Sequence, residues 1–246
     1  MRSLSASELL NIWEWGRNQP YCSRAIRLLA TACPETSIDK LTQLSLGQRD
    51  AMLLTLREWI FGSQLVSQVT CPSCGEDLEL NFDVADMRVA SLSLEPVEKY
   101  SLELADYEVS FRLPNSLDLM AIAEHKQLDI AQEVLLERCI LGAACSGKLL
   151  PLDQLPSHVI DAVIAQMAQA DPQANVPLDV SCPACNHQWQ SLFDIVSFFW
   201  TEINAWAFRV LREVHILASA YGWREADILA MSPRRRQLYL EMVVGR

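Results

Sequence analysis

The sequence has no apolar run that is long enough and uncharged enough to cross a membrane. Its most apolar stretch, residues 195–221, carries more charged or titratable side chains than a bilayer core accepts. These are Glu202, Arg209, Arg212, Glu213 and His215. The first 15 residues also lack the apolar segment of a secretion signal. We therefore expect a soluble protein that is made in the cytoplasm and has no membrane partner.

Glycine, proline and histidine are scarce. Only 8 glycines and 11 prolines occur in 246 residues, and half of the residues are hydrophobic, which is the composition of a folded chain. The four histidines form no catalytic set, and no phosphate loop, nucleophile elbow or metalloprotease motif is present. We predict a protein that is not an enzyme and takes no small-molecule substrate. An active site of carboxylates that meet only in the fold is the alternative.

Basic residues are scarce in the middle of the chain. The net charge is −11, and residues 75–180 contain 19 acidic but only 6 basic side chains, whereas both ends are nearly neutral. An acidic surface repels phosphate backbones, so the charge distribution argues against nucleic-acid binding.

The sequence does contain two short cysteine motifs. Cys71-Pro-Ser-Cys74 and Cys182-Pro-Ala-Cys185 each place two thiolates on a tight turn, and a closed structural zinc site needs four. We predict one structural zinc ion bound by these four cysteines. A redox-active pair is the alternative for a single motif, and His187 could compete as a ligand.

The surroundings of the two motifs are similar. Each motif is followed by Gly75 or Asn186, where a tight turn needs a residue that tolerates positive φ. Phe-Asp follows at 82–83 and at 193–194, at the same distance from the first cysteine, and strand-like segments flank both motifs. We predict a zinc ribbon of two hairpins over residues 65–84 and 176–193, with residues 85–175 as an acidic insertion.

Four more cysteines lie in apolar, helix-like segments. We expect them to be reduced, mostly buried and free of metal, because a chain with this much core needs no disulfide scaffold. They are Cys22, Cys33, Cys139 and Cys145.

The fold class that the sequence predicts is α+β, mainly helical. Residues 1–64 should hold a helix capped by Ser7, a second over 21–33 and a third from Ser45 to Gly62. The insertion should contain a hairpin and three helices, over residues 100–113, 117–124, 128–145 and 156–169. A helical C-terminal arm, residues 194–246, should contain helices over 194–221, 225–230 and 233–244. The last of these places four apolar residues on one face: Leu238, Tyr239, Met242 and Val243.

Three segments resemble a known family. They are Cys-Pro-Ser-Cys-Gly at 71–75, Arg-Leu-Pro-Asn-Ser-Leu-Asp at 112–118, and the run from Asp171-Pro172 through the second motif to Ala-Tyr-Gly-Trp-Arg-Glu-Ala-Asp-Ile-Leu at 220–229. Over about residues 45–246 the chain resembles the T4-type phage baseplate proteins, which also occur in phage-derived contractile injection systems. Residues 1–44 show nothing diagnostic.

The resemblance implies a structural component of the baseplate or its hub, or a chaperone that assembles it. Its partners would be other baseplate, hub or tail proteins. It would act in the cytoplasm, where tails assemble, or in the finished tail particle. A cytosolic zinc ribbon that binds nucleic acid or the transcription machinery is the alternative.

Three consecutive arginines, Arg234, Arg235 and Arg236, fall in the first turn of the last predicted helix. The helix dipole is positive at that end, so an exposed cation there loses about 0.3–1 kcal/mol. We predict that these arginines bind an acidic partner surface. Internal ion pairs, with Glu225, Asp227 or the acidic insertion, are one alternative, and phosphate binding is another.

Overall fold

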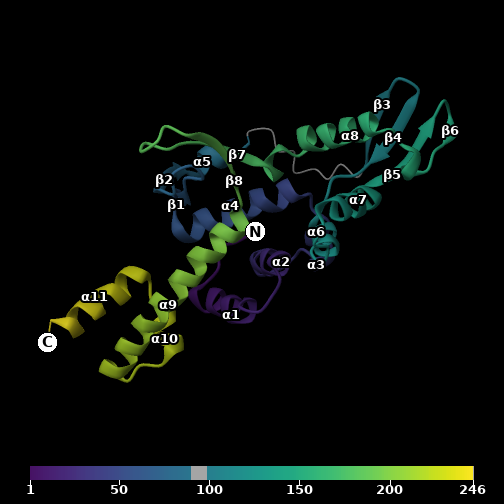
Figure 1. Cartoon of the computed structure of the whole chain (residues 1–246). Coiled ribbons are helices and arrows are strands. Elements are labelled where there is room, and N and C mark those ends of the chain that lie inside the picture. The colour runs from purple at the N-terminus through teal and green to yellow at the C-terminus, as the bar shows by residue number, and fades with distance from the viewer. Residues whose placement is uncertain (90–98, 246) are drawn as a thin grey trace. The chain divides into compact units, whose positions relative to one another are not determined.

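The computed structural model describes residues 1–89 and 99–245 and shows an α+β protein with more helix than strand (Figure 1). The predicted class is confirmed. Two compact units divide the chain: Met1–Glu35 together with Asp194–Arg246, and Thr36–Phe193. The four-segment division drawn from the sequence stays a prediction. In the part of the chain that the structure describes, no helix has the length and apolarity of a membrane span.

The first unit is helical. Its elements are α1 (Ala6–Gly16), α2 (Tyr21–Ala32), α9 (Ile195–Tyr221), α10 (Glu225–Leu229) and α11 (Pro233–Val244). Asp194 caps α9, and Gly222, in the left-handed conformation, ends it. The buried side chains of α9 recur every three or four residues, and the other four helices all contact it. Helix α9 is therefore the central element of this unit.

The predicted cap of the first helix is wrong. Ser5, not Ser7, accepts the N–H of Glu8, and the Glu8 carboxylate accepts the N–H of Ser5 in return. This reciprocal capping box needs an acidic residue three positions after the serine, which Ser5 has. The helix consequently begins at Ala6.

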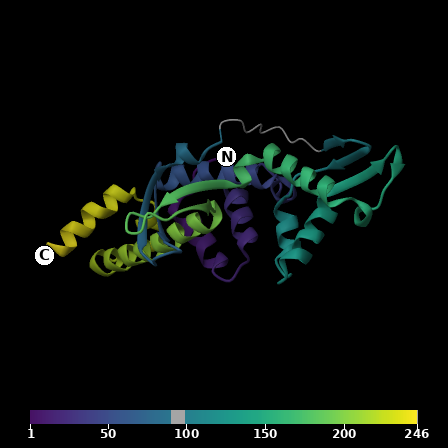
Figure 2. The ribbon, with the colours of Figure 1, turned by 45° about the horizontal axis from the view of Figure 1, so that its top comes forward.

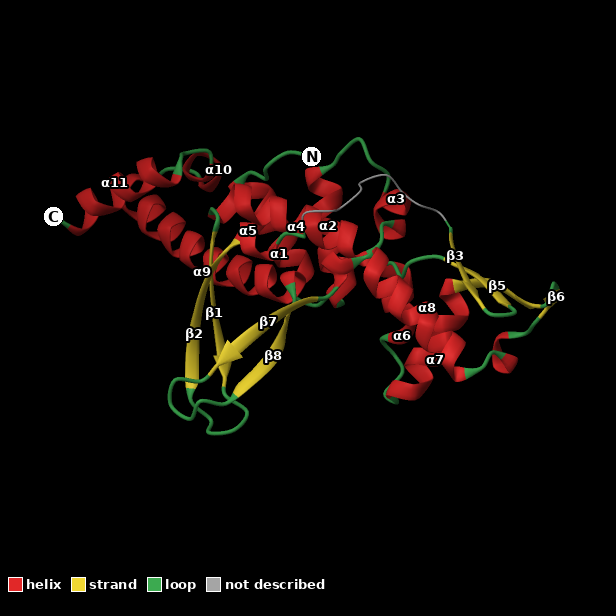
Figure 3. Cartoon of the chain, turned by 90° about the horizontal axis from the view of Figure 1, so that it is seen from above, coloured by secondary structure: helices red, strands yellow, loops and turns green. Residues whose placement is uncertain are grey.

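The second unit begins with helices and contains two separate hairpins. Helix α3 (Ile38–Gln43), which was not predicted, precedes α4 (Leu46–Phe61), which Ser45 caps as predicted. The hairpins are antiparallel pairs, β1 (Gln64–Thr70) with β2 (Asp77–Asp83) and β7 (Val176–Ser181) with β8 (Gln188–Phe193). Figure 3 shows them side by side, with their turns at the same end. The strands predicted around both cysteine motifs are confirmed.

Between the hairpins the chain forms a four-stranded sheet and its covering helices. The sheet order is β3 (Tyr100–Leu104), β4 (Tyr107–Phe111), β5 (Ile140–Cys145) and β6 (Lys148–Leu149). The helical elements are α5 (Val84–Met87), α6 (Ser116–Ile122), α7 (Leu128–Cys139), α8 (Ser157–Ala170) and the short η1 (Leu152–Gln154) and η2 (Pro172–Ala174). Buried residues of β4 and α8 form one core, and α8 runs alongside the sheet in Figure 2.

The helix predicted over 128–145 is wrong in its last part. Helix α7 ends at Cys139, and residues 140–145 form strand β5, with Ala143 opposite Val109 of β4. The short apolar run with Gly142 and two alanines has no strand-like alternation of its own. Pairing with β4 decides its conformation, and such tertiary context routinely overrides local preference.

The last residues of the insertion are hydrogen-bonded to its first residues. The Gln173 side chain donates to the carbonyl of Met87 at 2.8 Å and accepts the N–H of Val89 at 2.9 Å. Two residues earlier, Asp171 accepts the N–H of Gly47 at the start of α4, also at 2.9 Å. Residues 171–173, at the end of the insertion, are thus hydrogen-bonded to residues 87–89, at its start, and to α4. This arrangement positions β7 beside the first hairpin.

Candidate metal centre

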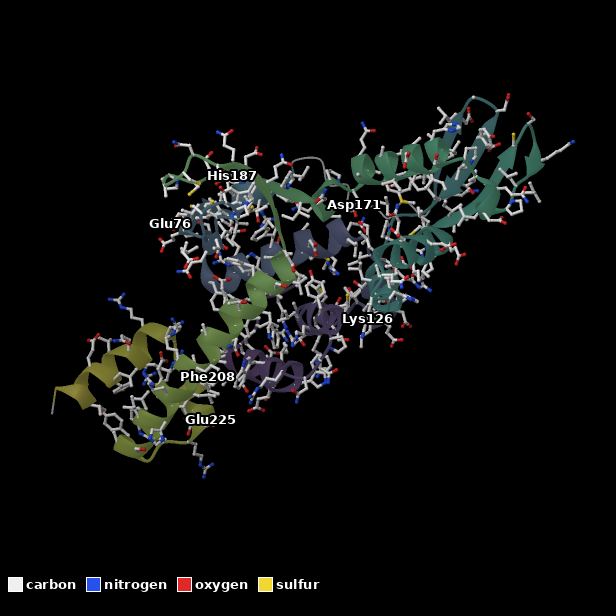
Figure 4. All side chains as sticks on the ribbon, viewed as in Figure 1. Glu76, Lys126, Asp171, His187, Phe208 and Glu225 are labelled. Atoms are coloured by element: carbon white, nitrogen blue, oxygen red, sulfur yellow. The ribbon has the colours of Figure 1, made fainter. Side chains whose placement is uncertain are left out.

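The two cysteine turns have the same backbone geometry. In the first, the N–H of Cys71 donates to the carbonyl of Glu76 at 2.8 Å, and the N–H of Gly75 donates to the carbonyl of Cys71 at 2.9 Å. In the second, the N–H of Cys182 donates to the carbonyl of His187 at 2.9 Å, and the N–H of Asn186 donates to the carbonyl of Cys182 at 2.8 Å. Figure 4 labels Glu76 and His187, which mark the two turns.

Both turns use the left-handed backbone that the sequence predicts. Gly75 has φ +77° and Asn186 has φ +58°. Glycine adopts this conformation without strain, and asparagine is one of the few other residues that visits it routinely. The two residues therefore let each turn bring its pair of sulfurs to the same side.

The four sulfurs come together as predicted. The Sγ atoms of Cys71, Cys74, Cys182 and Cys185 all lie within 4.8 Å of one another. Cys71 is 3.7 Å from Cys185, and Cys74 is 3.6 Å from Cys182. Four Zn–S bonds of ~2.3 Å at tetrahedral angles would hold the sulfurs ~3.8 Å apart. These separations are far above the ~2.05 Å of a disulfide, so the four cysteines can hold a metal ion.

Each turn contributes one buried and one exposed cysteine. Cys71 and Cys182 are 2% and 1% exposed, and they pack with Leu78 and Val180 in a small core between the hairpins. Cys74 and Cys185 are exposed. The site is therefore anchored from within and reachable from solvent on one side, which gives an ion a path of entry.

The surroundings shift the pKa values of two of the thiols, Cys71 and Cys74, in opposite directions. Burial raises the pKa of Cys71, but N–H groups of Cys74 and Ser73 and the neighbouring thiols outweigh it, so the pKa falls to about 7. At Cys74 the N–H of Glu76 lowers the pKa, but the hydrogen bond with Cys185 and the burial outweigh it and raise the pKa to about 12. A divalent cation would stabilise all four thiolates together.

His187 belongs to the turn and not to the sulfur cluster. Its ring lies nearly parallel to that of Trp189, with the centroids 5.8 Å apart. Among the described residues, the group of potential metal ligands at this place consists of the four cysteines.

The Phe-Asp repeat has a structural role at the other end of the hairpins. Phe82 and Phe193, which occupy the same position in the two repeats, meet edge to face with ring centroids 5.6 Å apart. The aspartates that follow, Asp83 and Asp194, each cap the next helix. The hairpin pair is thus joined by sulfurs at the turns and by an aromatic contact at the base.

A comparison with protein families matches residues 6–200 to the T4 bacteriophage base plate protein family. The chain belongs to this family. A search of curated proteins and a search of solved structures found no match. The family match includes both cysteine motifs and the N-terminal helices, in which the sequence shows nothing diagnostic. The Ala-Tyr-Gly-Trp segment at 220–223 and the three arginines lie beyond its end.

Within the baseplate family match, the segment 112–118 stabilises the fold. The side chain of Asp118 is fully buried. Its carboxylate accepts hydrogen bonds from both Nη atoms of Arg112, at 2.6 and 2.8 Å, and from Nε of Arg138, at 2.8 Å. It also accepts the N–H of Asn115, whose side chain caps α6. The segment holds one buried carboxylate between two partly exposed arginines at a helix start, so the motif has a structural role in the fold.

The three arginines of α11 have different environments. Arg236 is 3% exposed, and it donates to Glu213 of α9 at 3.0 Å and to the carbonyl of Met231 at 2.8 Å. Arg234 and Arg235 are exposed, and the guanidinium of Arg235 lies 5.9 Å from the ring centre of Tyr239. The role of Glu213 was not predicted, because nothing in the sequence pairs a residue of α9 with one 23 positions later.

The other cysteines lie inside the two units. Cys22, Cys33 and Cys139 are buried, and Cys145 is partly buried. Burial and the charge of nearby Asp118 together raise the pKa of Cys139 to about 11, although Arg112 and Arg138 oppose the shift. A thiol in such a place is a core residue and a poor metal ligand.

Proposed function

We propose that the chain is a non-enzymatic structural component or assembly factor of the baseplate or hub of a contractile tail, either of a phage or of a phage-derived injection system. The observation that carries the proposal is the match to the baseplate family over residues 6–200. The four-cysteine cluster within that match supplies the physical feature that the role needs, a rigid joint between distant segments.

The ion that suits this cluster is zinc. Four thiolates at tetrahedral separations are the donor set of closed structural zinc sites, in which no coordination position stays open for a substrate. We interpret the two hairpins as a zinc ribbon into which residues 85–175 are inserted. The ion would stabilise the fold and would take no part in a reaction.

The metal assignment is tested on the purified protein. Native mass spectrometry should find one zinc ion per chain, and X-ray absorption should find four sulfurs at ~2.3 Å. Cys74→Ser and Cys185→Ser should each release the ion, because three thiolates no longer close the site. Cys145→Ser, which removes a thiol outside the cluster, is the matched control and should keep it. Protein prepared without chelator that carries no metal would contradict the assignment.

Docking to other tail proteins is assigned to the exposed arginines of α11. Arg234 and Arg235 have cationic groups at the positive end of a helix, where they do not stabilise it, whereas Arg236 is held inside the unit by Glu213. We therefore place the predicted partner contact on Arg234 and Arg235 and assign Arg236 to holding α11 against α9.

Coexpression with the neighbouring tail genes tests the docking. The double variant Arg234→Glu/Arg235→Glu should stay folded and zinc-loaded but lose copurification with baseplate proteins. A variant that loses thermal stability while it still copurifies would contradict the docking role. If finished particles contain the chain, it is a resident component. If tail intermediates contain it but finished particles do not, it is an assembly chaperone. Its absence from every tail complex would contradict the whole proposal.

A further inference from the structure

Helix α11 has an inner face that packs on α9 and an outer face that the described part of the chain leaves uncovered. On the inner face, Arg236 pairs with Glu213, and the Tyr239 ring meets the ring of Trp223 edge to face at 4.8 Å. On the outer face, Leu238 is 50% and Met242 is 58% exposed. Two large apolar side chains one helical turn apart form a ridge in contact with solvent.

Two residues of opposite charge lie along one side of this ridge. Arg234 lies one turn before Leu238, and Glu241 lies two turns after Arg234, on the same side of the ridge. Within the described residues, Arg234 forms no ion pair, and the Glu241 carboxylate accepts a hydrogen bond from the side-chain amide of Gln237, at 3.2 Å. One helix face thus carries an arginine and a glutamate about 10 Å apart. Among the residues that the structure describes, neither forms an ion pair, and Glu241 lines a groove that Arg209 and Arg212 of α9 also line.

This spacing is self-complementary. In an antiparallel pair of α11 helices centred between Gln237 and Leu238, Arg234 of one chain lies opposite Glu241 of the other. The same contact occurs a second time on the other side of the two-fold axis, as in any isologous interface. The two Leu238 side chains then meet near the axis, and each Met242 packs against the partner helix. Every exposed group of the ridge finds a complement.

We infer that α11 is a self-association surface, on which a second copy of this chain binds antiparallel through Leu238, Met242 and two reciprocal Arg234–Glu241 ion pairs. The inference rests on the docking role proposed for the α11 arginines, and it names the acidic group that Arg234 meets. Arg235, on the other side of the ridge and stacked on Tyr239, stays available to a different partner.

The interface is small, and the association should be correspondingly weak. Two 12-residue helices bury less surface than a standard stable interface, so we expect a dissociation constant on the order of 100 μM. A weak contact of this kind suits a symmetric particle, where neighbouring copies are held at a high effective concentration.

Sedimentation equilibrium of the zinc-loaded full chain tests the inference. The protein should pass from monomer to dimer as its concentration rises to about 1 mM. Arg234→Glu and Glu241→Arg should each weaken the dimer about tenfold, because each creates two like-charge contacts, and the double exchange Arg234→Glu/Glu241→Arg should restore it. Leu238→Ser should abolish it.

Arg224→Glu is the matched control, since it makes the same charge change outside α11 and should leave the dimer intact. Unchanged circular dichroism in every variant would show that α11 remains folded. A monomer at all concentrations, or a double exchange that stays monomeric, would overturn the inference. A monomer that still copurifies with tail proteins through Arg234 and Arg235 would overturn self-association alone and leave the proposed docking role standing.

Discussion

At the scale of single residues, Asp118 is a fully buried charge with three hydrogen-bonding neighbours. Burial raises its pKa, but hydrogen bonds from Arg112, the N–H of Asn115 and Arg138 outweigh it and hold the pKa below its ordinary value. A carboxylate with a lowered pKa stabilises the folded state above its unfolded-state pKa, and the stabilisation is lost as the pH falls through the folded-state value. The network therefore contributes fully near neutral pH.

Removal of this carboxylate should be strongly destabilising. Asp118→Ala leaves the partly exposed guanidinium groups of Arg112 and Arg138 and the N–H of Asn115 without their buried acceptor, and we expect urea unfolding at pH 7 to show a loss of about 2–4 kcal/mol. The difference from the unchanged protein should shrink below about pH 4, where the carboxylate of the unfolded chain begins to gain its proton while that of the folded chain is still ionised. Asp129→Ala, at an exposed position of α7, is the control. A loss below 1 kcal/mol would contradict the assigned role.

Asp171 has the opposite pH dependence. Burial raises its pKa above the ordinary value, although the N–H of Gly47, Ser45 and the charge of Arg49 oppose the shift. A carboxyl with a raised pKa contributes stability below its unfolded-state pKa and loses it as the pH rises through the folded-state value.

Asp171→Asn, which keeps an oxygen for the N–H of Gly47 but cannot ionise, should remove this dependence. The free energy of unfolding of the variant, relative to the unchanged protein, should therefore improve as the pH rises from about 4 towards 7. Urea titrations at several pH values provide the measurement. A difference that is flat with pH would show that Asp171 titrates normally. Gly47→Ala is the steric counterpart, because its Cβ would lie 2.0 Å from an oxygen of Asp171.

At the scale of elements, the sequence predicts best where a local chemical signal defines an end. The strands beside the cysteine motifs, the hairpin that turns at Ala105 and the helix that follows Ser45 all occur as expected, because turn residues and caps fix them locally. Strand β5 was predicted as helix and α3 was missed. Both are short, and contacts with remote segments decide their conformation.

The cysteine turns allow an element-scale prediction. Gly75→Val places a β-branched residue at φ +77° and should strain the first turn by about 1–2 kcal/mol, which lowers metal affinity roughly tenfold in a competition assay with a zinc chelator. Asn186→Gly, the equivalent position in the second turn, relaxes the backbone and should retain full affinity. If Gly75→Val binds zinc as tightly as the unchanged protein, the left-handed turn does not control the site.

At the scale of the whole molecule, the candidate metal centre joins segments that are far apart in the sequence. Cys74 and Cys182 are separated by 108 positions, and a cross-link over a loop of that length removes about 4–5 kcal/mol of chain entropy from the unfolded state. All four cysteines could be predicted from their spacing, because ligand chemistry leaves few alternatives. The Arg236–Glu213 pair could not, because it depends on how α11 packs against α9.

Removal of the ion should therefore loosen one part of the chain and leave another unchanged. Treatment with a strong chelator should speed amide hydrogen exchange in β1, β2, β7 and β8, since the small core between these hairpins is held together at the sulfurs. Exchange in α1 and α9, which share a core in the other unit and contain no ligand of the site, should stay the same. The Phe82–Phe193 contact should protect the base of the hairpins longer than the turns, so exchange should rise first next to the cysteines. Cys74→Ser without chelator should reproduce this pattern, and uniform exchange changes across both units would show that the ion stabilises the chain as a whole rather than this joint.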